Sequence, residues 1–161
     1  LCSIYPKALI TADSGELTHE LTDKWTLASG DYVDEMYAVF VKSVNNVMGL
    51  KVYAKESWIE FAPHNNEYTL KINGHEVNPS SVTNGTLVPD SPTERWVFKM
   101  TSYGASTYIE LRDRPVTIIY SSTNVALLLE NELQGKIAGL CGHLDGTHKT
   151  TVPKEYYLIH V

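Results

Sequence analysis

The sequence predicts an all-β protein, either a β-sandwich or a barrel. About ten short runs rich in β-branched and aromatic residues follow one another at near-regular spacing. Several of these runs alternate apolar and polar side chains, as a half-buried strand does. The pair Asn73-Gly74 stands between two such runs, and Asn-Gly is a strong hairpin signal because both central residues of a type I′ turn need positive φ.

The expected strands can be given in chain order. They are residues 7–11, 25–28, 37–42, 50–55, 57–61, 68–72, 75–77, 95–100, 107–112, 116–120 and 125–130. The last run lacks a β-branched majority and would also suit a helical turn, but its neighbours end in turn residues a few positions away, which favours a strand. Residues 13–15 predict a turn with Gly15 at positive φ, and residues 29–35 predict a polar loop. Residues 78–93 predict a loop with room for one short strand.

Length and composition indicate one packed domain, residues 1–161. Hydrophobic residues make up 43% of the chain and charged residues 20%, which excludes global disorder. A net charge of −6 without a Lys/Arg cluster argues against a nucleic-acid partner. No apolar run approaches the ~20 residues that span a bilayer, so we expect no transmembrane segment. The start at Leu1 lacks signal-peptide character, and we expect a piece of a longer secreted protein.

Residues 139–147 concentrate the chemistry of the chain. They combine three glycines with Cys141, His143 and Asp145. Glycine at this density predicts a backbone bent into conformations that side chains forbid, which would hold the Cys141 sulfur at a defined position.

Counting does not assign the two cysteines. Cys2 and Cys141 are either two buried thiols of a cytosolic protein or one disulfide of a secreted protein. A bridge would join the two ends of the domain and close a very long loop, which contributes roughly 5 kcal/mol in the chain-entropy model.

The segment Gly139-Leu140-Cys141-Gly142, followed by Asp145-Gly146, resembles the end of a von Willebrand factor type D domain. The usual text of that family is Gly-Leu-Cys-Gly-Asn-aromatic-Asp-Gly, and His143 stands here in place of the asparagine. Residues 11–15 resemble the family's Thr-Phe-Asp-Gly turn, and residues 71–77 resemble its Val-x-Val-Asn-Gly hairpin. The matching segments keep the family's order from Cys2 to about Thr150.

This resemblance implies a β-sandwich with a glycine-rich C-terminal clasp and a Cys2–Cys141 disulfide. Relatives commonly carry further cysteines where this chain has Lys24, Tyr32 and Ala138. The cysteines at the Tyr32 and Ala138 positions pair with each other in the family, so their joint loss leaves no orphan thiol.

The resemblance also implies a calcium site that this chain has degraded. Type D domains bring the aspartate of the opening turn, here Asp13, and oxygen donors after the Gly-Leu-Cys-Gly motif, here Asp145, to one calcium ion. Calcium needs six to eight oxygens, whereas His143 offers nitrogen and Lys149 adds positive charge. We therefore expect calcium to be weak or absent and no cofactor to be required. Zinc on His143, Asp145 and His148 is conceivable, and solvated histidines on a loop are the plainer interpretation.

The remaining motifs point to secretion and away from catalysis. Asn84-Gly85-Thr86 is a glycosylation sequon on a predicted loop. No Gly-x-Ser-x-Gly nucleophile, Walker loop, Rossmann glycine run or zinc helix is present, and Ala138 excludes a Cys-x-x-Cys redox pair at Cys141. We predict that the protein is not an enzyme.

Segments 24–31 and 37–42 look most like the type D domain of vitellogenins, whose text runs Cys-Trp-x-Leu, Asp-Cys and Phe-Ala-Val-x-x-Lys. The expected role is structural and storage-related, in a secreted yolk or lipid-transfer protein of haemolymph, plasma or egg yolk. Its partners would be the rest of the parent polypeptide and a cell-surface receptor or matrix protein. The alternatives are an adhesion or clotting module and, less favoured, part of a luciferase-like oxidase.

Overall fold

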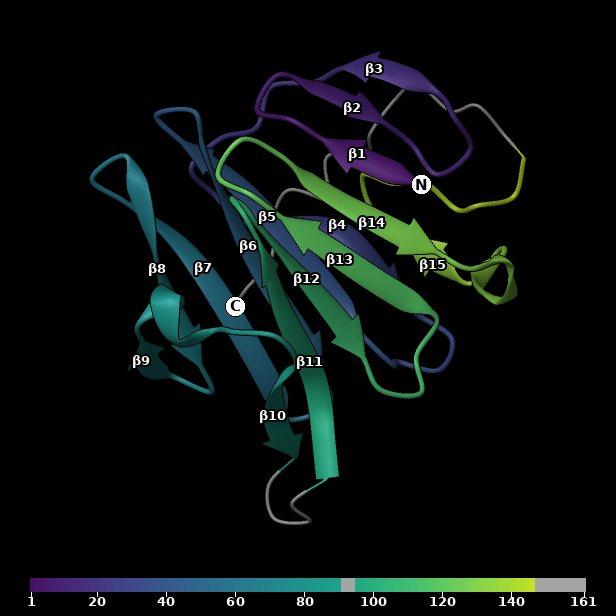
Figure 1. Ribbon diagram of the computed structural model, residues 1–161. Helices are drawn as coiled ribbons and strands as arrows, with labels where there is room; N and C mark the ends of the chain where they lie inside the picture. Colours follow the sequence, from purple (N-terminus) through teal and green to yellow (C-terminus); the bar gives the residue numbers. More distant parts are fainter. Residues whose placement is uncertain (91–94, 147–161) are drawn as a thin grey trace.

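The computed structural model describes residues 1–90 and 95–146. This part of the chain forms two antiparallel sheets and two short 3₁₀ turns, η1 (Pro79–Ser81) and η2 (Asn131–Leu133), without an α-helix. Figure 1 shows the eight-stranded sheet in front of the seven-stranded sheet. The predicted all-β class is confirmed, and the two layers are consistent with a β-sandwich. None of the described residues belongs to a helix long and apolar enough to cross a membrane.

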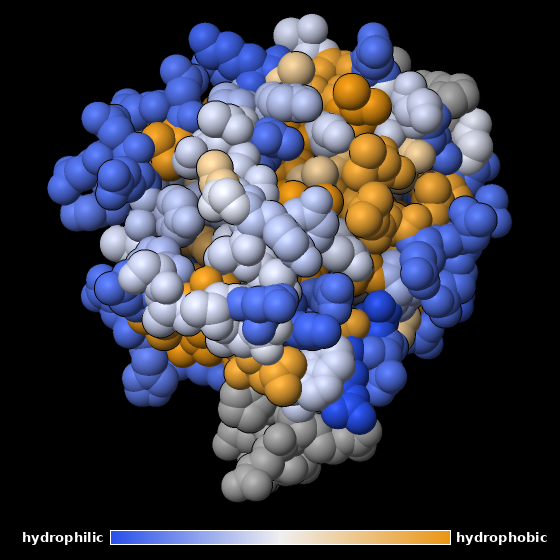
Figure 2. Space-filling view, in the orientation of Figure 1, coloured by the Kyte–Doolittle hydropathy of each residue, from blue (hydrophilic) through white to orange (hydrophobic). Residues whose placement is uncertain are grey.

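The eight-stranded sheet brings both ends of the described chain together. Its spatial order is β10 (Thr86–Asp90), β11 (Arg95–Tyr103), β12 (Ser106–Leu111), β13 (Val116–Tyr120), β14 (Val125–Leu129), β1 (Cys2–Ile4), β2 (Ala8–Ile10) and β3 (Glu16–Thr18). The N-terminal strand β1 pairs with the late strand β14, with Cys2 opposite Leu127. Figure 2 shows apolar side chains on the outer face of this sheet towards the β2 and β14 side, where Ile10 and Leu128 remain exposed.

The seven-stranded sheet is mostly a run of consecutive hairpins. Its order is β15 (Ile137–Ala138), β4 (Thr26–Asp31), β5 (Ala38–Val44), β6 (Val47–Ala54), β7 (Ser57–His64), β8 (Glu67–Ile72) and β9 (His75–Val77). The β8–β9 turn has φ of 50° at Asn73 and 85° at Gly74, as the Asn-Gly pair predicted. The β5–β6 and β7–β8 turns use Asn45-Asn46 and Asn65-Asn66 at positive φ, because asparagine tolerates the left-handed region.

A single apolar core lies between the sheets. In β13 the buried residues alternate with half-buried ones, so Ile118 and Tyr120 point inward. The ring of Tyr120 stacks on Phe61 of the opposite sheet with centroids 4.3 Å apart. Its hydroxyl donates to the Met48 carbonyl at 2.7 Å, which satisfies the polar atom inside the core. Burial raises the pKa of Tyr120, because the phenolate would lose its hydration there.

Three details of the predicted elements are wrong. Residues 29–31 are not loop but the end of β4, which runs on past a register shift between Leu27 and Ser29. The turn at 13–15 places Ser14 at positive φ, 66°, rather than Gly15. The strands β1, β3 and β15 were not predicted, because two or three residues are too few to show a periodicity. The strand assignment of residues 125–130 is confirmed by β14, and the expected short strand in 78–93 is β10.

Candidate functional site

The C-terminal clasp, defined here as residues 139–146, lies against the backbone of β4. Leu140 N–H donates to Leu27 O at 3.0 Å, and Cys141 N–H donates to Ala28 O at 2.9 Å. Gly139 has a φ of 128°, and a Cβ there would lie only 2.6 Å from Ala28 O. Only glycine allows this close approach, as the glycine density of the segment predicted.

The clasp is joined to the other sheet by a disulfide. Cys2 of β1 and Cys141 are bonded to each other, their Cα atoms lie 5.6 Å apart, and both residues are fully buried. Because β1 belongs to the eight-stranded sheet and the clasp is hydrogen-bonded to β4, the bridge connects the two layers of the fold. It is the pairing that the resemblance implied.

Asp13, in the turn between β2 and β3, is hydrogen-bonded to the end of the clasp. Its carboxylate accepts N–H donations from Gly146 at 3.0 Å and from Asp145 at 3.3 Å. The neighbouring Ala12 N–H donates to Cys141 O at 3.0 Å, so the β2–β3 turn and the clasp are joined by both main-chain and side-chain contacts. The structure therefore brings Asp13 to the backbone of Asp145 and Gly146, using the N–H groups of the clasp as donors.

His143 is turned towards β15. Its Nδ1 lies 2.7 Å from the Ile137 carbonyl oxygen, which only accepts, so Nδ1 carries the proton in this contact. The His143 carbonyl in turn accepts from Gly135 N–H at 2.9 Å. Within residues 1–90 and 95–146, no three His, Cys, Asp or Glu side chains are grouped as metal ligands. His148 and Lys149, which entered the metal prediction, lie outside the described residues.

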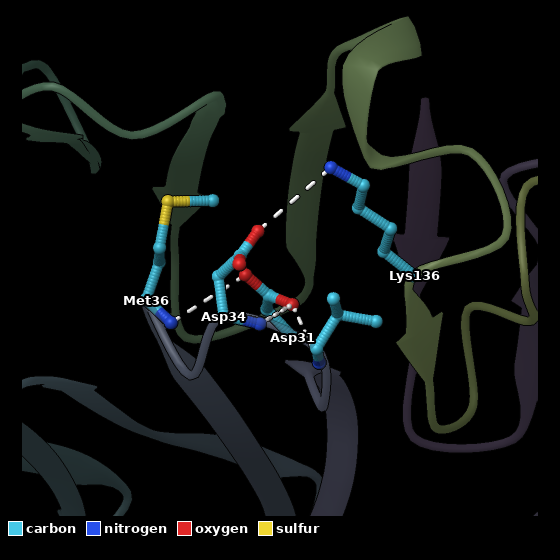
Figure 3. A network of polar contacts seen from close by, with 5 residues as sticks. Asp31, Asp34, Met36 and Lys136 are labelled. Atoms are coloured by element: carbon cyan, nitrogen blue, oxygen red, sulfur yellow. Dashed lines mark hydrogen bonds and ion pairs between the residues drawn. The ribbon is translucent and has the colours of Figure 1, made fainter.

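A second polar network, which the sequence did not single out, lies where β4 ends (Figure 3). Asp31 is buried and its Oδ1 accepts N–H donations from Val33 and Asp34, each at 3.0 Å. Its Oδ2 accepts from Met36 N–H at 3.5 Å. Asp34 pairs with Lys136 just before β15 at 3.8 Å. The loop is thus fixed by a buried carboxylate, and the signal for it was the Asp31 side chain placed just before a strand-connecting loop.

Tyr32 extends this contact to the chain that precedes the clasp. Its N–H donates to Lys136 O at 3.2 Å, and its hydroxyl donates to Gly135 O at 2.9 Å. Arg114, between β12 and β13, donates from Nε to the Met36 carbonyl at 2.7 Å. Parts of the chain that are far apart in sequence therefore meet around this loop.

The surroundings of this loop raise the pKa of the Tyr37 hydroxyl. Tyr37, directly before β5, is buried and its hydroxyl lies 2.8 Å from the Ser29 hydroxyl. Burial raises the pKa of Tyr37 to about 12, and the hydrogen bond with Ser29 partly opposes this shift.

The predicted glycosylation residue Asn84 lies in an exposed turn directly before β10. Thr86, the third residue of the sequon, accepts a hydrogen bond at Oγ1 from Thr83 N–H at 3.0 Å. The structure thus places the sequon on the surface, where an attached glycan would not meet the core.

These contacts join the two sheets to each other. They also join the β2–β3 turn and the loop after β4 to the C-terminal clasp and the residues just before it. Comparison with models of known protein families found no matching family, and comparison with curated proteins found no match.

Proposed function

We propose that this chain is a non-catalytic extracellular domain of the von Willebrand factor type D kind, from a vitellogenin-like yolk or lipid-transfer protein. The observation that carries the proposal is the buried Cys2–Cys141 bridge, which unites the first and last motifs of the resemblance. Disulfides persist in oxidising compartments, which favours secretion.

Two further contacts support the proposal. The turn that contains Asp13 meets the segment that contains Asp145, as the two ends of the type D motif set would. Tyr32 and Ala138, where the family carries paired cysteines, line the same pocket. Hydrogen bonds of Tyr32 to residues 135 and 136 tie these segments together in place of a second bridge.

The cysteine content favours the yolk class over adhesion or clotting. The chain has only two cysteines, and both are used in the internal bridge. No thiol remains for the intermolecular bridges with which clotting and mucin relatives build multimers. The role that fits is a rigid domain within a larger polypeptide, serving assembly, receptor or matrix contact and nutrient reserve.

Detection of the native protein tests this proposal. An antibody raised against the refolded domain should recognise a protein of extracellular fluid and egg extract whose amount falls as the embryo develops. Its migration without reductant should show no disulfide-linked multimer. A protein confined to the cytosol would refute the extracellular assignment, and disulfide-linked multimers would favour the adhesion class instead.

A further inference from the structure

A row of small side chains crosses the seven-stranded sheet and ends at aromatic rings. Ala138 of β15 pairs with Gly30 of β4, Gly30 pairs with Ala38 of β5, and Ala38 pairs with Tyr53 of β6. Trp58 of β7 continues the row opposite Tyr53. Three small residues next to two large rings leave a trough on the surface of the sheet.

This trough is a pocket of 450 Å³ whose lining includes Ala138, Gly30, Ala38 and Tyr53. The volume falls within the range of roughly 300–1,000 Å³ that is usual for small-molecule sites. A Cβ at Gly30 would lie 3.2 Å from the side chain of Leu27, which also lines the pocket, so the absence of a side chain at Gly30 leaves this space to Leu27 and the trough.

Tyr53 forms the aromatic wall of the trough. Phe40 contacts its ring edge-on, with centroids 5.9 Å apart and an interplanar angle of 85°, which fixes the ring orientation. The ring centroid of Trp58 lies 6.2 Å from that of Tyr53, and the Lys51 ammonium lies 5.0 Å from the Trp58 centroid. Tyr53 lines the pocket and Trp58 does not, so of these two rings Tyr53 is the one that a ligand would meet; Tyr32 and Tyr37 also contribute to the lining.

Opposite charges stand at the rim of the trough. Glu35 and Lys55 both line the pocket and both are exposed. Within residues 1–90 and 95–146, neither side chain makes a hydrogen bond or an ion pair. Asp31 also lines the pocket, but its carboxylate accepts from three backbone N–H donors and holds the rim loop in shape.

We propose that this trough binds a neutral hexose of an extracellular glycan, stacked on Tyr53. The C–H face of a pyranose is apolar and weakly positive, and it complements the negative face of an aromatic ring. Sugar hydroxyls both donate and accept, so they match an ammonium at Lys55 and a carboxylate at Glu35 together. The small floor residues leave room for a ring, and the site needs no metal.

The charges select against an acidic ligand. A phosphate or a sialic acid would meet Lys55 but also Glu35, on a chain whose net charge is −6. A neutral sugar avoids this repulsion. This inference extends beyond the proposed function, since it assigns a recognition site that a purely structural domain would not need.

Saturation-transfer NMR with lactose, cellobiose and mannobiose, alongside sialyllactose, tests the proposal on the full chain. At least one neutral disaccharide should receive saturation through one pyranose ring at millimolar concentration. Ala38→Leu should fill the trough and weaken that binding by about tenfold or more, which corresponds to about 1.4 kcal/mol. Ala126→Leu, the same change on the outer face of β14, is the matched control and should bind as the unaltered chain does.

A second variant keeps the test independent of core packing. Glu35→Ala with Lys55→Ala removes the hydrogen-bonding groups of two exposed side chains and should weaken binding by about tenfold, while the melting temperature stays unchanged. Absence of saturation transfer to every neutral sugar would overturn the proposal. So would tighter binding of sialyllactose than of lactose, or binding that survives both the trough-filling and the rim variants. None of these outcomes bears on the secreted, disulfide-bonded nature of the domain.

Discussion

The contact between Gly139 and β4 makes a quantitative prediction for Gly139→Ala. The new Cβ would lie 2.6 Å from Ala28 O and 2.9 Å from Leu27 O, on a backbone whose φ is 128°. A side chain in so sparsely populated a region costs about 1–3 kcal/mol. To relieve the clash the clasp must move away, and the two hydrogen bonds from Leu140 and Cys141 then weaken, at about 1 kcal/mol each.

The total is a loss of about 3–5 kcal/mol in the free energy of unfolding, or a fall in melting temperature of roughly 6–20 °C for a chain of this size. Gly135→Ala is the matched control, because φ is 73° there and no atom lies within 4 Å of the added Cβ. It carries only the left-handed penalty of about 1–2 kcal/mol.

Urea unfolding of both variants, followed by the fluorescence of the three tryptophans, measures the difference. The disulfide is kept oxidised in all samples, so that only the clasp backbone differs. Equal destabilisation by the two substitutions would show that the approach of the clasp to Ala28 imposes no steric constraint, and the reasoning would fail.

Three other predictions concern the bridge, the metal and alkaline pH. Thiol labelling of unfolded, unreduced protein should find no reactive thiol, and two labelled cysteines would contradict both the bridge and secretion. The double variant Cys2→Ala with Cys141→Ala should lower the free energy of unfolding by about 5 kcal/mol, because the bridge spans 139 residues. The melting temperature should not differ between chelator and millimolar calcium, because the Asp13 carboxylate already accepts two backbone N–H donors; a large upward shift that Asp145→Ala abolishes would reveal a calcium site. The folded-state pKa of Tyr37, about 12, exceeds the ordinary 10.0, so the folded state holds this proton more tightly than the unfolded state does. The free energy of unfolding should therefore fall as pH rises from 10 towards 12. An equally steep fall in Tyr37→Phe, measured by urea unfolding at each pH, would assign the effect to other groups.

The long strands could be predicted because their side chains alternate within one segment. In β13, and in β7 from Ser57 to Phe61, every second residue is buried, and the local sequence shows that period. The short strands β1, β3 and β15 could not be predicted in this way. Their pairing depends on partners far along the chain, such as β14 for β1, and two or three residues contain no detectable period.

The same distinction holds for the candidate site. Gly139 and Cys141 stood out because glycine density and a rare cysteine are local signals. Asp31 did not stand out, since its importance comes from burial and from three N–H donors in the loop that follows it. The trough beside it was equally invisible, because its floor combines single small residues from three strands that only the sheet register aligns.

The role of Asp13 shows where a residue's chemistry depends on its partners. The sequence indicates that the opening turn and the clasp meet, and it suggests a cation as the reason. The structure gives the Asp13 carboxylate two N–H donors, from Asp145 and Gly146, while the His143 ring bonds to the Ile137 carbonyl. A cation bound by Asp13 would have to displace donors that already neutralise part of its charge. Substitution of Asp13 by Asn keeps an acceptor oxygen and should preserve the clasp, whereas Asp13→Ala leaves both N–H groups without this acceptor and should destabilise it by about 1–3 kcal/mol. Equal unfolding free energies for these two variants would mean that the contact contributes nothing to the closure of the clasp.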